Sequence, residues 1–498
     1  MANESAVLFQ LGLDDITPGD IVALADGRYR AVLNPDEGYR AQLQRGAEIV
    51  RLQAQAGQPV IELLDREDDS RLDTATGLMQ RHATATEAIL RERESAAVIG
   101  ARLAVLARGY SGVRTQVLEL MCELLNLRVL PRIPASTPGS SDGGRIPMSY
   151  VAAAMTGHRE VSYLGRVVLA SEGLRAARLS PVELRPKEAM AIMSGTSVAT
   201  GLGCLAWERG RRLVRFATAL TAMAHDVTHG NPGHFDPRLD ALKPHEGTRT
   251  AAQWLRDDIE YGGRSREGCS TDPGVLRCAP QLLGLLIDAI RRTERVLEVE
   301  LSSVSDAPIV HPTTGELLIG GNSYGGQVAF ALDGLSSAIA AVVGLMARLL
   351  ALVCDPDASR GLNRDLVADP SVGRHGFRSM RATVSGLVAQ ARKHALPGTG
   401  FLTAFGHDHD LPCPAQLSAI DCLRALSVTE SVAAIVALAM CQAVDLRDGQ
   451  GCHRRASAIY GAVRQLVPRL TKDRAQDRDV VSVLELFRAG LLPLGSLD

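Results

Sequence analysis

The sequence has few aromatic residues and almost no surplus of either charge. Phe, Trp and Tyr make up 4% of its 498 residues, and 54 Lys and Arg stand against 56 Asp and Glu, which gives a formal net charge of −2. Without a basic surplus or a basic patch, the electrostatic footprint of a nucleic-acid-binding protein is missing. The nine cysteines form no C-x-x-C pair, which argues against structural zinc and fits a reducing compartment.

We also expect no export signal, and the sequence has no long uncharged run. Its N-terminus has no basic stretch followed by a long apolar one. The longest uncharged apolar runs, after Asp333 and after Glu430, are shorter than the roughly 18–20 residues that span a bilayer. We therefore predict a globular, cytoplasmic protein that does not enter a membrane, with these two runs as buried core helices.

Hydrophobic residues make up 46% of the chain and favour helices, because Ala and Leu are frequent among them. Short helical stretches alternate with Gly- and Pro-rich turns in the first part, where Ser136 to Pro147 is predicted to be a loop. Later windows repeat apolar residues at three- and four-residue spacing, as in Val328 to Val353. These patterns predict an all-α fold with a loop-rich N-terminal domain over residues 1–185 and a helical bundle over residues 186–498.

Seven short motifs follow one another along the chain. They are Ala107 to Arg114; Arg132-Ile133-Pro134, thirteen residues before Pro147; Ser194-Gly195-Thr196; Asp272-Pro273 with Leu276-Arg277-Cys278; Val304 to Pro308; Gly320-Gly321-Asn322; and Asp408-His409. Their residues and their order along the chain resemble motifs of the histidine and phenylalanine ammonia-lyase family, over roughly residues 30 to 450. The resemblance implies a lyase-like long-helix bundle, and a homotetramer whose pockets are lined by more than one subunit.

The same resemblance identifies the place of the family's catalytic group. Members cyclise an internal Ala-Ser-Gly into a methylidene-imidazolone electrophile (MIO), in which the serine loses its hydroxyl to leave a methylene. Counting without gaps from Pro134 to Pro147 puts Ser141-Asp142-Gly143 at that triad. Because aspartate has no β-hydroxyl to eliminate, this register predicts that MIO is absent and that no other cofactor is used. A register centred on Ser141 would restore the serine, but it puts Asp142 where the glycine nitrogen should attack.

Other positions of the resemblance are changed or retained. Ile61 and Gly274 stand where the family has tyrosines, and His407 replaces a Glu or Gln. Arg277, by contrast, matches the arginine that holds the substrate carboxylate through a bidentate fork. The resemblance therefore implies a substrate with a carboxylate. The further positions assigned to substrate binding are Ser194, Asn322, Tyr324 and Glu62, the last in an acidic run that replaces a Gly-rich lid segment.

Asp142 and His407 are the candidate acid/base residues, with Ser141 and Gly143 beside the first. Helix N-termini point at this loop in the related fold, so an Asp142 carboxylate should be ionised. It could hold a substrate ammonium, pair with Arg277 or accept a proton, whereas the plain alternative is an Asp-Gly turn residue without chemistry. His407 stands near the substrate in the family frame and could transfer protons.

No metal site is predicted. His407 to Asp410 concentrate two imidazoles and two carboxylates, but adjacent residues rarely all face one ligand. His225 and His229 are one helical turn apart, yet the Glu of an H-E-x-x-H site is missing.

We therefore predict a lyase-like enzyme without MIO that acts on a small amino acid or carboxylate by elimination, addition or rearrangement. Two alternatives stay open at this point. One is a non-catalytic relative that serves as a binding or structural subunit. The other is an ammonia lyase or aminomutase that forms its ring around Ser141.

Overall fold

The computed structural model describes residues 6–56, 75–135, 145–259, 272–398, 413–449 and 452–497. The chain folds into two compact units, each built from segments that are far apart in the sequence. The first unit comprises Met1–Glu208, Thr293–Asp333 and Pro397–Ile420, and the second comprises Arg209–Arg292, Gly334–Leu396 and Asp421–Asp498. The domains predicted at residues 1–185 and 186–498 stay a prediction.

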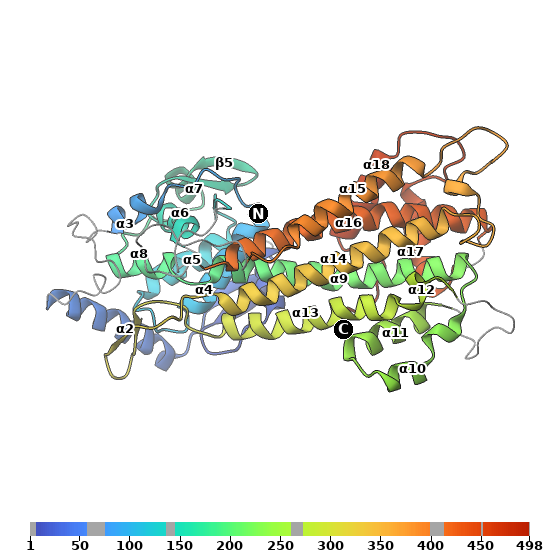
Figure 1. The fold of residues 1–498 in the computed structure, drawn as a ribbon. Coiled ribbons are helices and arrows are strands. Elements are labelled where there is room, and N and C mark those ends of the chain that lie inside the picture. Colours follow the sequence, from blue (N-terminus) through green and yellow to red (C-terminus); the bar gives the residue numbers. More distant parts are fainter. Residues whose placement is uncertain are drawn as a thin grey trace, which may run out of the picture. The chain divides into compact units, whose positions relative to one another are not determined.

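The first unit holds the strands that the described residues form (Figure 1). Its strands β1 and β2 pair in parallel, β3, β4 and β5 form an antiparallel sheet, and β6 pairs antiparallel with β7. The elements are β1 (Val7–Leu11), α1 (Pro18–Ala25), β2 (Tyr29–Leu33), α2 (Glu37–Gln55), α3 (Ala75–His82), α4 (Glu92–Leu106), α5 (Thr115–Asn126), β3 (Leu130–Pro131), α6 (Arg145–Met155), β4 (Glu160–Tyr163), β5 (Arg166–Leu169), α7 (Ala170–Ala176), α8 (Pro186–Met193), β6 (Ile309–Val310) and β7 (Leu317–Leu318).

Long helices make up most of the second unit, and four of them have residues in both units. These four are α9 (Ser197–Val227), α13 (Ala279–Leu301), α14 (Gly326–Val353) and α16 (Ala415–Leu446). The other elements of the second unit are η1 (Pro232–Phe235), α10 (Pro237–Leu242), α11 (Glu246–Asp258), α12 (Gly274–Arg277), η2 (Arg364–Leu366), α15 (Arg378–His394), α17 (Arg454–Leu466) and α18 (Asp477–Arg488). The all-α fold class predicted from the sequence is confirmed.

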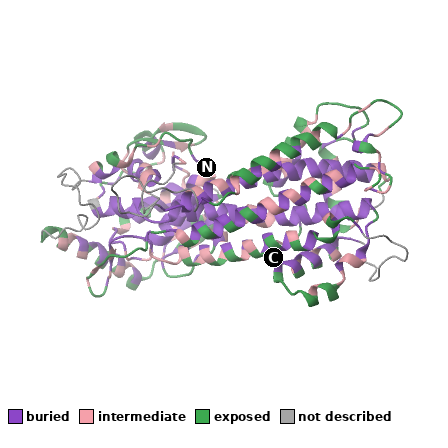
Figure 2. Ribbon diagram, viewed as in Figure 1, coloured by how far each residue is buried: buried purple, intermediate pink, exposed green. Residues whose placement is uncertain are grey.

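The long helices are largely buried (Figure 2). Three helical stretches are long and apolar enough to cross a membrane by length and composition, with 100%, 61% and 78% of their apolar windows buried: Lys187–Val227, Gly326–Val353 and Ala415–Leu446. The prediction that the apolar runs form buried core helices agrees with this burial. The runs were also predicted to be too short to span a membrane. The helices that contain them continue beyond the charged residues at the ends of each run and are long enough to do so, so this prediction is wrong for the helices.

Close packing of α11 on α13 depends on two glycines. A Cβ atom at Gly247 would lie 2.2 Å from the carbonyl oxygen of Gly284, and one at Gly284 would lie 2.5 Å from the backbone nitrogen of Thr248. The Gly247 backbone N–H also donates to Oδ1 of Asp288 at 2.9 Å. The first turn of α11 is therefore fixed against the side of α13.

The structure corrects the predicted loop over residues 136–147 at its end. Residues 136–144 lie outside the described residues, but α6 already begins at Arg145. Pro147 is compatible with this start, because the N–H that proline lacks has no helical partner in the first turn of a helix.

Candidate active site

The turn after α8 is shaped around Gly195. Ser194 ends α8 with an extended backbone, and Gly195 follows at a φ of +89°, in the left-handed region that glycine favours. A Cβ atom at Gly195 would lie 2.3 Å from the carbonyl oxygen of Ser305 and 2.8 Å from Nη1 of Arg102. The turn therefore lies directly against α4 and the segment that precedes β6.

Three buried serine hydroxyls surround this turn. Ser194, Ser197 and Ser305 are at most 2% exposed, and their Oγ atoms have no hydrogen-bond partner among the residues that the structure describes. A buried hydroxyl is normally hydrogen-bonded, so a polar ligand or another polar segment would be stabilised next to them. Ser194, assigned to substrate binding from the sequence, has the surroundings that such a role needs.

A buried ion pair holds α8 to the segment before β6. Lys187 Nζ donates to Oδ2 of Asp306 at 2.7 Å, with side chains 2% and 0% exposed. Oδ1 of Asp306 accepts the backbone N–H of Ala307 at 2.8 Å. Burial lowers the pKa of Lys187, although Asp306 favours its charged form. The pair and the Gly195 contact fix the two segments in one register.

A second charged pair ties α8 to the motif that ends at Arg114. The Glu188 carboxylate accepts Nε and Nη2 of Arg114, both at 2.7 Å, and also the Arg114 backbone N–H at 3.1 Å. Glu188 is 1% exposed, whereas Arg114 is partly exposed. This bidentate pairing raises the pKa of Arg114. Two of the seven sequence motifs thus meet at the first turn of α8.

Thr196 connects the turn to α13 and to the loop before α14. Its hydroxyl donates to Oε2 of Glu300 at 2.7 Å. A Cβ atom at Gly325 would lie 3.1 Å from Cγ2 of Thr196 and 3.4 Å from Sγ of Cys413. The Gly325 N–H donates to the same sulfur at 3.3 Å. Three segments of the first unit therefore meet at this point, and they contain Thr196, Gly325 and Cys413.

Asn322 and Tyr324, predicted to bind substrate, lie in this loop before α14. Nδ2 of Asn322 donates to the carbonyl oxygen of Val304 at 3.2 Å. Tyr324 is 40% exposed, and its ring packs over Gly326, where a Cβ atom would lie 2.7 Å from the ring. The structure therefore gathers Ser194, Asn322 and the segment around Ser305 in one region, as the motif resemblance implied.

Arg277 belongs to the second unit, at the end of α12. Its Nε donates to the backbone carbonyl of Asp272 at 2.9 Å, and the side chain is otherwise exposed. Its two terminal amino groups make no hydrogen bond to the residues that the structure describes. The guanidinium thus presents the two donors that a bidentate carboxylate contact requires.

The loop that carries Arg277 is anchored by the buried Asp272 side chain. One carboxylate oxygen of Asp272 accepts the Asn231 N–H at 2.6 Å, and the other accepts Nη2 of Arg360 at 2.8 Å. Arg360 also donates to the carbonyls of Thr228 and His229, just beyond α9, so it caps this helix end. His234 Nε2 accepts the Asp272 N–H at 3.3 Å, and burial lowers the pKa of His234.

The structure separates the histidines near residue 225. The α9 helix ends at Val227, and His229 has a φ of +52°, so His225 and His229 do not share a helical turn as the sequence suggested. His225 Nδ1 instead lies 3.1 Å from the Asp226 carboxylate, which His453 also contacts at 3.0 Å. Within the described ranges, no group of three or more His, Cys, Asp or Glu side chains could hold a metal ion.

Several predicted site residues lie outside the described residues, and sequence reasoning missed others. The predicted residues outside are Glu62, Ser141, Asp142, Gly143 and His407. The missed residues are Arg102, Lys187, Glu188 and Glu300 around the turn, and Arg360 near Arg277. The signal for two of them was present, because Lys187 and Glu188 are the only charges in the otherwise apolar helix α8.

Glu300 gives this region a testable pH dependence. Burial raises its pKa, while the Thr196 hydrogen bond opposes the shift. The unfolded chain then loses this proton at a lower pH than the folded chain, so the charged form destabilises the fold once the pH exceeds both pKa values. The Glu300→Gln variant should therefore have the same melting temperature as the wild type near about pH 4. Near about pH 8 the variant should melt at a higher temperature than the wild type. Circular dichroism measures both melting temperatures. If the variant and the wild type differed by the same amount at both pH values, the prediction would be contradicted.

The fold and these motif segments define a helical enzyme of the ammonia-lyase type. The family model described as aromatic amino acid lyase matches residues 16–465, and the chain belongs to this family.

The relatives are enzymes of the same kind. A histidine ammonia-lyase from Koribacter versatilis is 32% identical over 433 residues, covering 83% of this chain and 84% of that relative. A histidine ammonia-lyase from Burkholderia multivorans is 33% identical over 399 residues, covering 79% and 78%. Among solved structures, a tyrosine aminomutase from Streptomyces globisporus has a TM-score of 0.88 at 27% identity, covering 98% of both chains. The protein is thus a lyase-like enzyme.

Proposed function

We propose that this protein is a member of the family that works without MIO on a small amino acid or carboxylate, by elimination, addition or rearrangement. The proposal depends above all on Asp142, which occupies the triad position where ring formation needs a serine hydroxyl. Because the carboxylate cannot be lost as the hydroxyl is, the residues of this chain do not fit the MIO ring in the ungapped register. Acid/base chemistry is then assigned to Asp142 and His407, with Ser141 and Gly143 next to Asp142 in the sequence.

Substrate binding in this proposal starts from Arg277. Its Nε donates to the Asp272 carbonyl, while its terminal amino groups make no hydrogen bond to the described residues and suit a carboxylate. Histidine ammonia-lyases among the relatives support an amino acid as the substrate class. The proposal includes Ser194, Asn322, Tyr324 and Glu62 as further substrate contacts. It also includes assembly into a homotetramer and a cytoplasmic location, both of which come from the resemblance.

Intact mass spectrometry of the purified protein tests the absence of the ring. MIO formation removes two waters from the chain, so we expect the mass calculated from the unmodified sequence. A mass lower by two waters would contradict the proposal and favour a ring centred on Ser141. The Ser141→Ala and Asp142→Ala variants, compared by the same measurement, would then show which residue the ring requires.

A further inference from the structure

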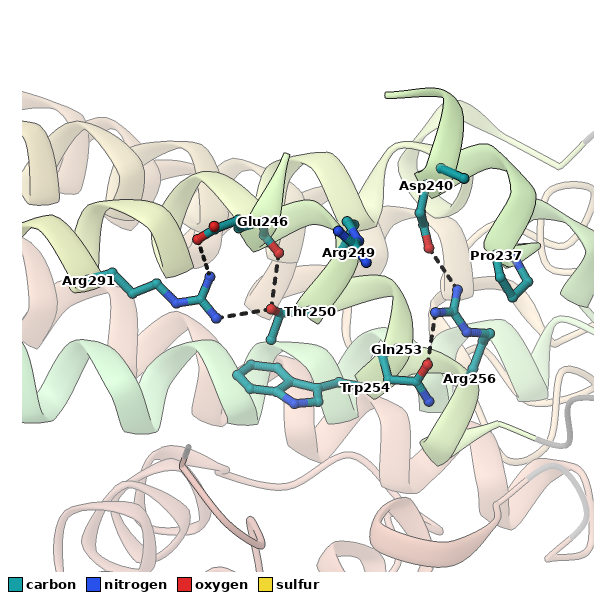
Figure 3. Close-up of a pocket in the computed structure, with 10 residues that line it drawn as sticks. Pro237, Asp240, Glu246, Arg249, Thr250, Gln253, Trp254, Arg256 and Arg291 are labelled. Atoms are coloured by element: carbon teal, nitrogen blue, oxygen red, sulfur yellow. Dashed lines mark hydrogen bonds and ion pairs between the residues drawn. The ribbon is translucent and has the colours of Figure 1, made fainter. Parts of the chain in front are cut away.

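A pocket of about 640 Å³ lies in the second unit between α10, α11 and α13 (Figure 3). It is lined by the outward face of α11, by Pro237, Asp240 and Ala241 of α10, and by Arg291 of α13. Ligand sites of small molecules commonly have volumes of roughly 300–1,000 Å³. The close approach of Gly247 and Gly284 described above fixes α11 on α13, so the walls of the pocket are held in place.

Arg256 forms one wall and donates to three protein acceptors. Its Nη1 donates to the carbonyl oxygen of Phe235 at 2.7 Å and to Oδ2 of Asp240 at 2.9 Å. Its Nη2 donates to Oε1 of Gln253 at 2.9 Å (Figure 3). The charge of Asp240 is therefore neutralised within the wall, and Arg256 serves to join α10 to α11.

Arg291 forms the opposite wall, and its positive charge is only weakly paired with nearby carboxylates. Nη2 of Arg291 donates to the Thr250 hydroxyl at 3.1 Å, and this hydroxyl donates to the Glu246 carbonyl at 3.0 Å. The carboxylates of Glu246 and Asp288 approach Arg291 only at 3.6 and 3.9 Å. Exposed pairs at such distances are weak and screened by water. Thr250 thus orients the guanidinium without neutralising it.

Arg249 adds a cation that no carboxylate pairs with in the described structure. Its guanidinium makes no hydrogen bond or ion pair with the residues described, and it projects between the two walls (Figure 3). The lining therefore holds three arginines against two carboxylates, one of which is engaged by Arg256. The surplus charge is positive and favours an anion.

Trp254 supplies a flat apolar surface with a further cation behind it. The guanidinium carbon of Arg215 lies 4.0 Å from the centre of the Trp254 ring. Arg215 is 3% exposed, and its Nε and Nη1 have no hydrogen-bond partner in the described part of the chain. Burial lowers its pKa to about 10, which leaves it charged at neutral pH. The Arg215 guanidinium therefore packs against one face of the indole and stabilises its position.

We propose that this pocket binds a small aromatic carboxylate, whose ring packs on Trp254 and whose carboxylate is held by Arg249 and Arg291. The apolar part of the lining also includes Pro237 and Ala241, on the α10 side of the pocket. The site is distinct from the one proposed for the reaction, because Arg277 is not part of its lining. It gives the protein a second place for a carboxylate ligand.

Tryptophan fluorescence can report on this site alone. The chain contains two tryptophans, and Trp207→Phe leaves Trp254 as the single tryptophan, which can be excited selectively over the tyrosines. In this background, titration with benzoate should quench the fluorescence with saturation. Benzamide has the same shape without the charge and should quench weakly. Arg249→Gln should weaken the benzoate affinity at least about tenfold, as expected for loss of a charge-assisted hydrogen bond.

Two control variants separate this site from other effects. Arg295→Gln removes an exposed charge one turn further along α13, outside the pocket, and should leave the benzoate affinity unchanged. Arg277→Met should also leave it unchanged, so the result does not depend on the proposed function. Absent quenching, equal quenching by benzamide, or unaltered affinity in Arg249→Gln would overturn the proposal. Quenching or protection from unfolding by inorganic phosphate but not by benzoate would overturn it too.

Discussion

Replacing Lys187 with methionine is expected to lower the free energy of unfolding by about 3–5 kcal/mol, because it leaves a buried carboxylate without its cation. Asp306 is 0% exposed in its side chain, and its ion pair with Lys187 is 2.7 Å long. Methionine fills a similar volume, so the loss reports the charge more than a cavity. Urea unfolding followed by circular dichroism measures the difference.

Two variants control for this result. Lys187→Met combined with Asp306→Asn should recover part of the loss, because an amide is less costly to bury than a carboxylate. Arg28→Met breaks the exposed Arg28–Asp26 pair at 3.2 Å and should cost less than about 1 kcal/mol. A loss in Lys187→Met as small as that in Arg28→Met would refute the assigned role of the buried pair.

Replacing Arg277 with methionine is expected to lower kcat/KM at least about 100-fold for an amino-acid or carboxylate substrate found by a mass-spectrometric screen. The side chain makes one described hydrogen bond, to the Asp272 carbonyl, so the variant should fold normally. Arg277→Lys keeps the charge but not the planar fork and should recover only part of the activity.

Arg295→Met is the matched control, because it removes an exposed arginine from α13 without touching the candidate site. It should retain wild-type kcat/KM and melting temperature. Wild-type turnover in Arg277→Met, at an unchanged melting temperature, would rule out the carboxylate contact assigned to this residue.

The sequence predicted the helical fold and part of the site for different physical reasons. Helical periodicity is a local property, so the long helices could be predicted from apolar spacing alone. The motifs and their order predicted membership of the ammonia-lyase family, and the family match over residues 16–465 confirms this prediction. The meeting of Ser194 with the Val304–Pro308 and Gly320–Asn322 segments was implied only by the resemblance, because contacts between distant segments have no local signal.

The supporting residues escaped prediction because their roles depend on burial and on partners far away in the chain. Glu300 lies 104 positions from Thr196, and Arg360 lies 88 positions from Asp272. In the sequence, both are ordinary charged residues of the kind expected on a solvated helix or loop. Predicted chemistry at Asp142 and His407 stays a prediction, because it rests on the motif frame.

The Arg277 guanidinium is bound to the protein on one side only, which affects how it would bind an anion. One edge is committed to the protein through Nε and the Asp272 carbonyl, while the other faces outward. This hydrogen bond restricts the rotation of the long side chain before any solute arrives. An incoming anion then meets a partly ordered fork, so less side-chain entropy is lost on binding, which favours tighter binding for the same contacts.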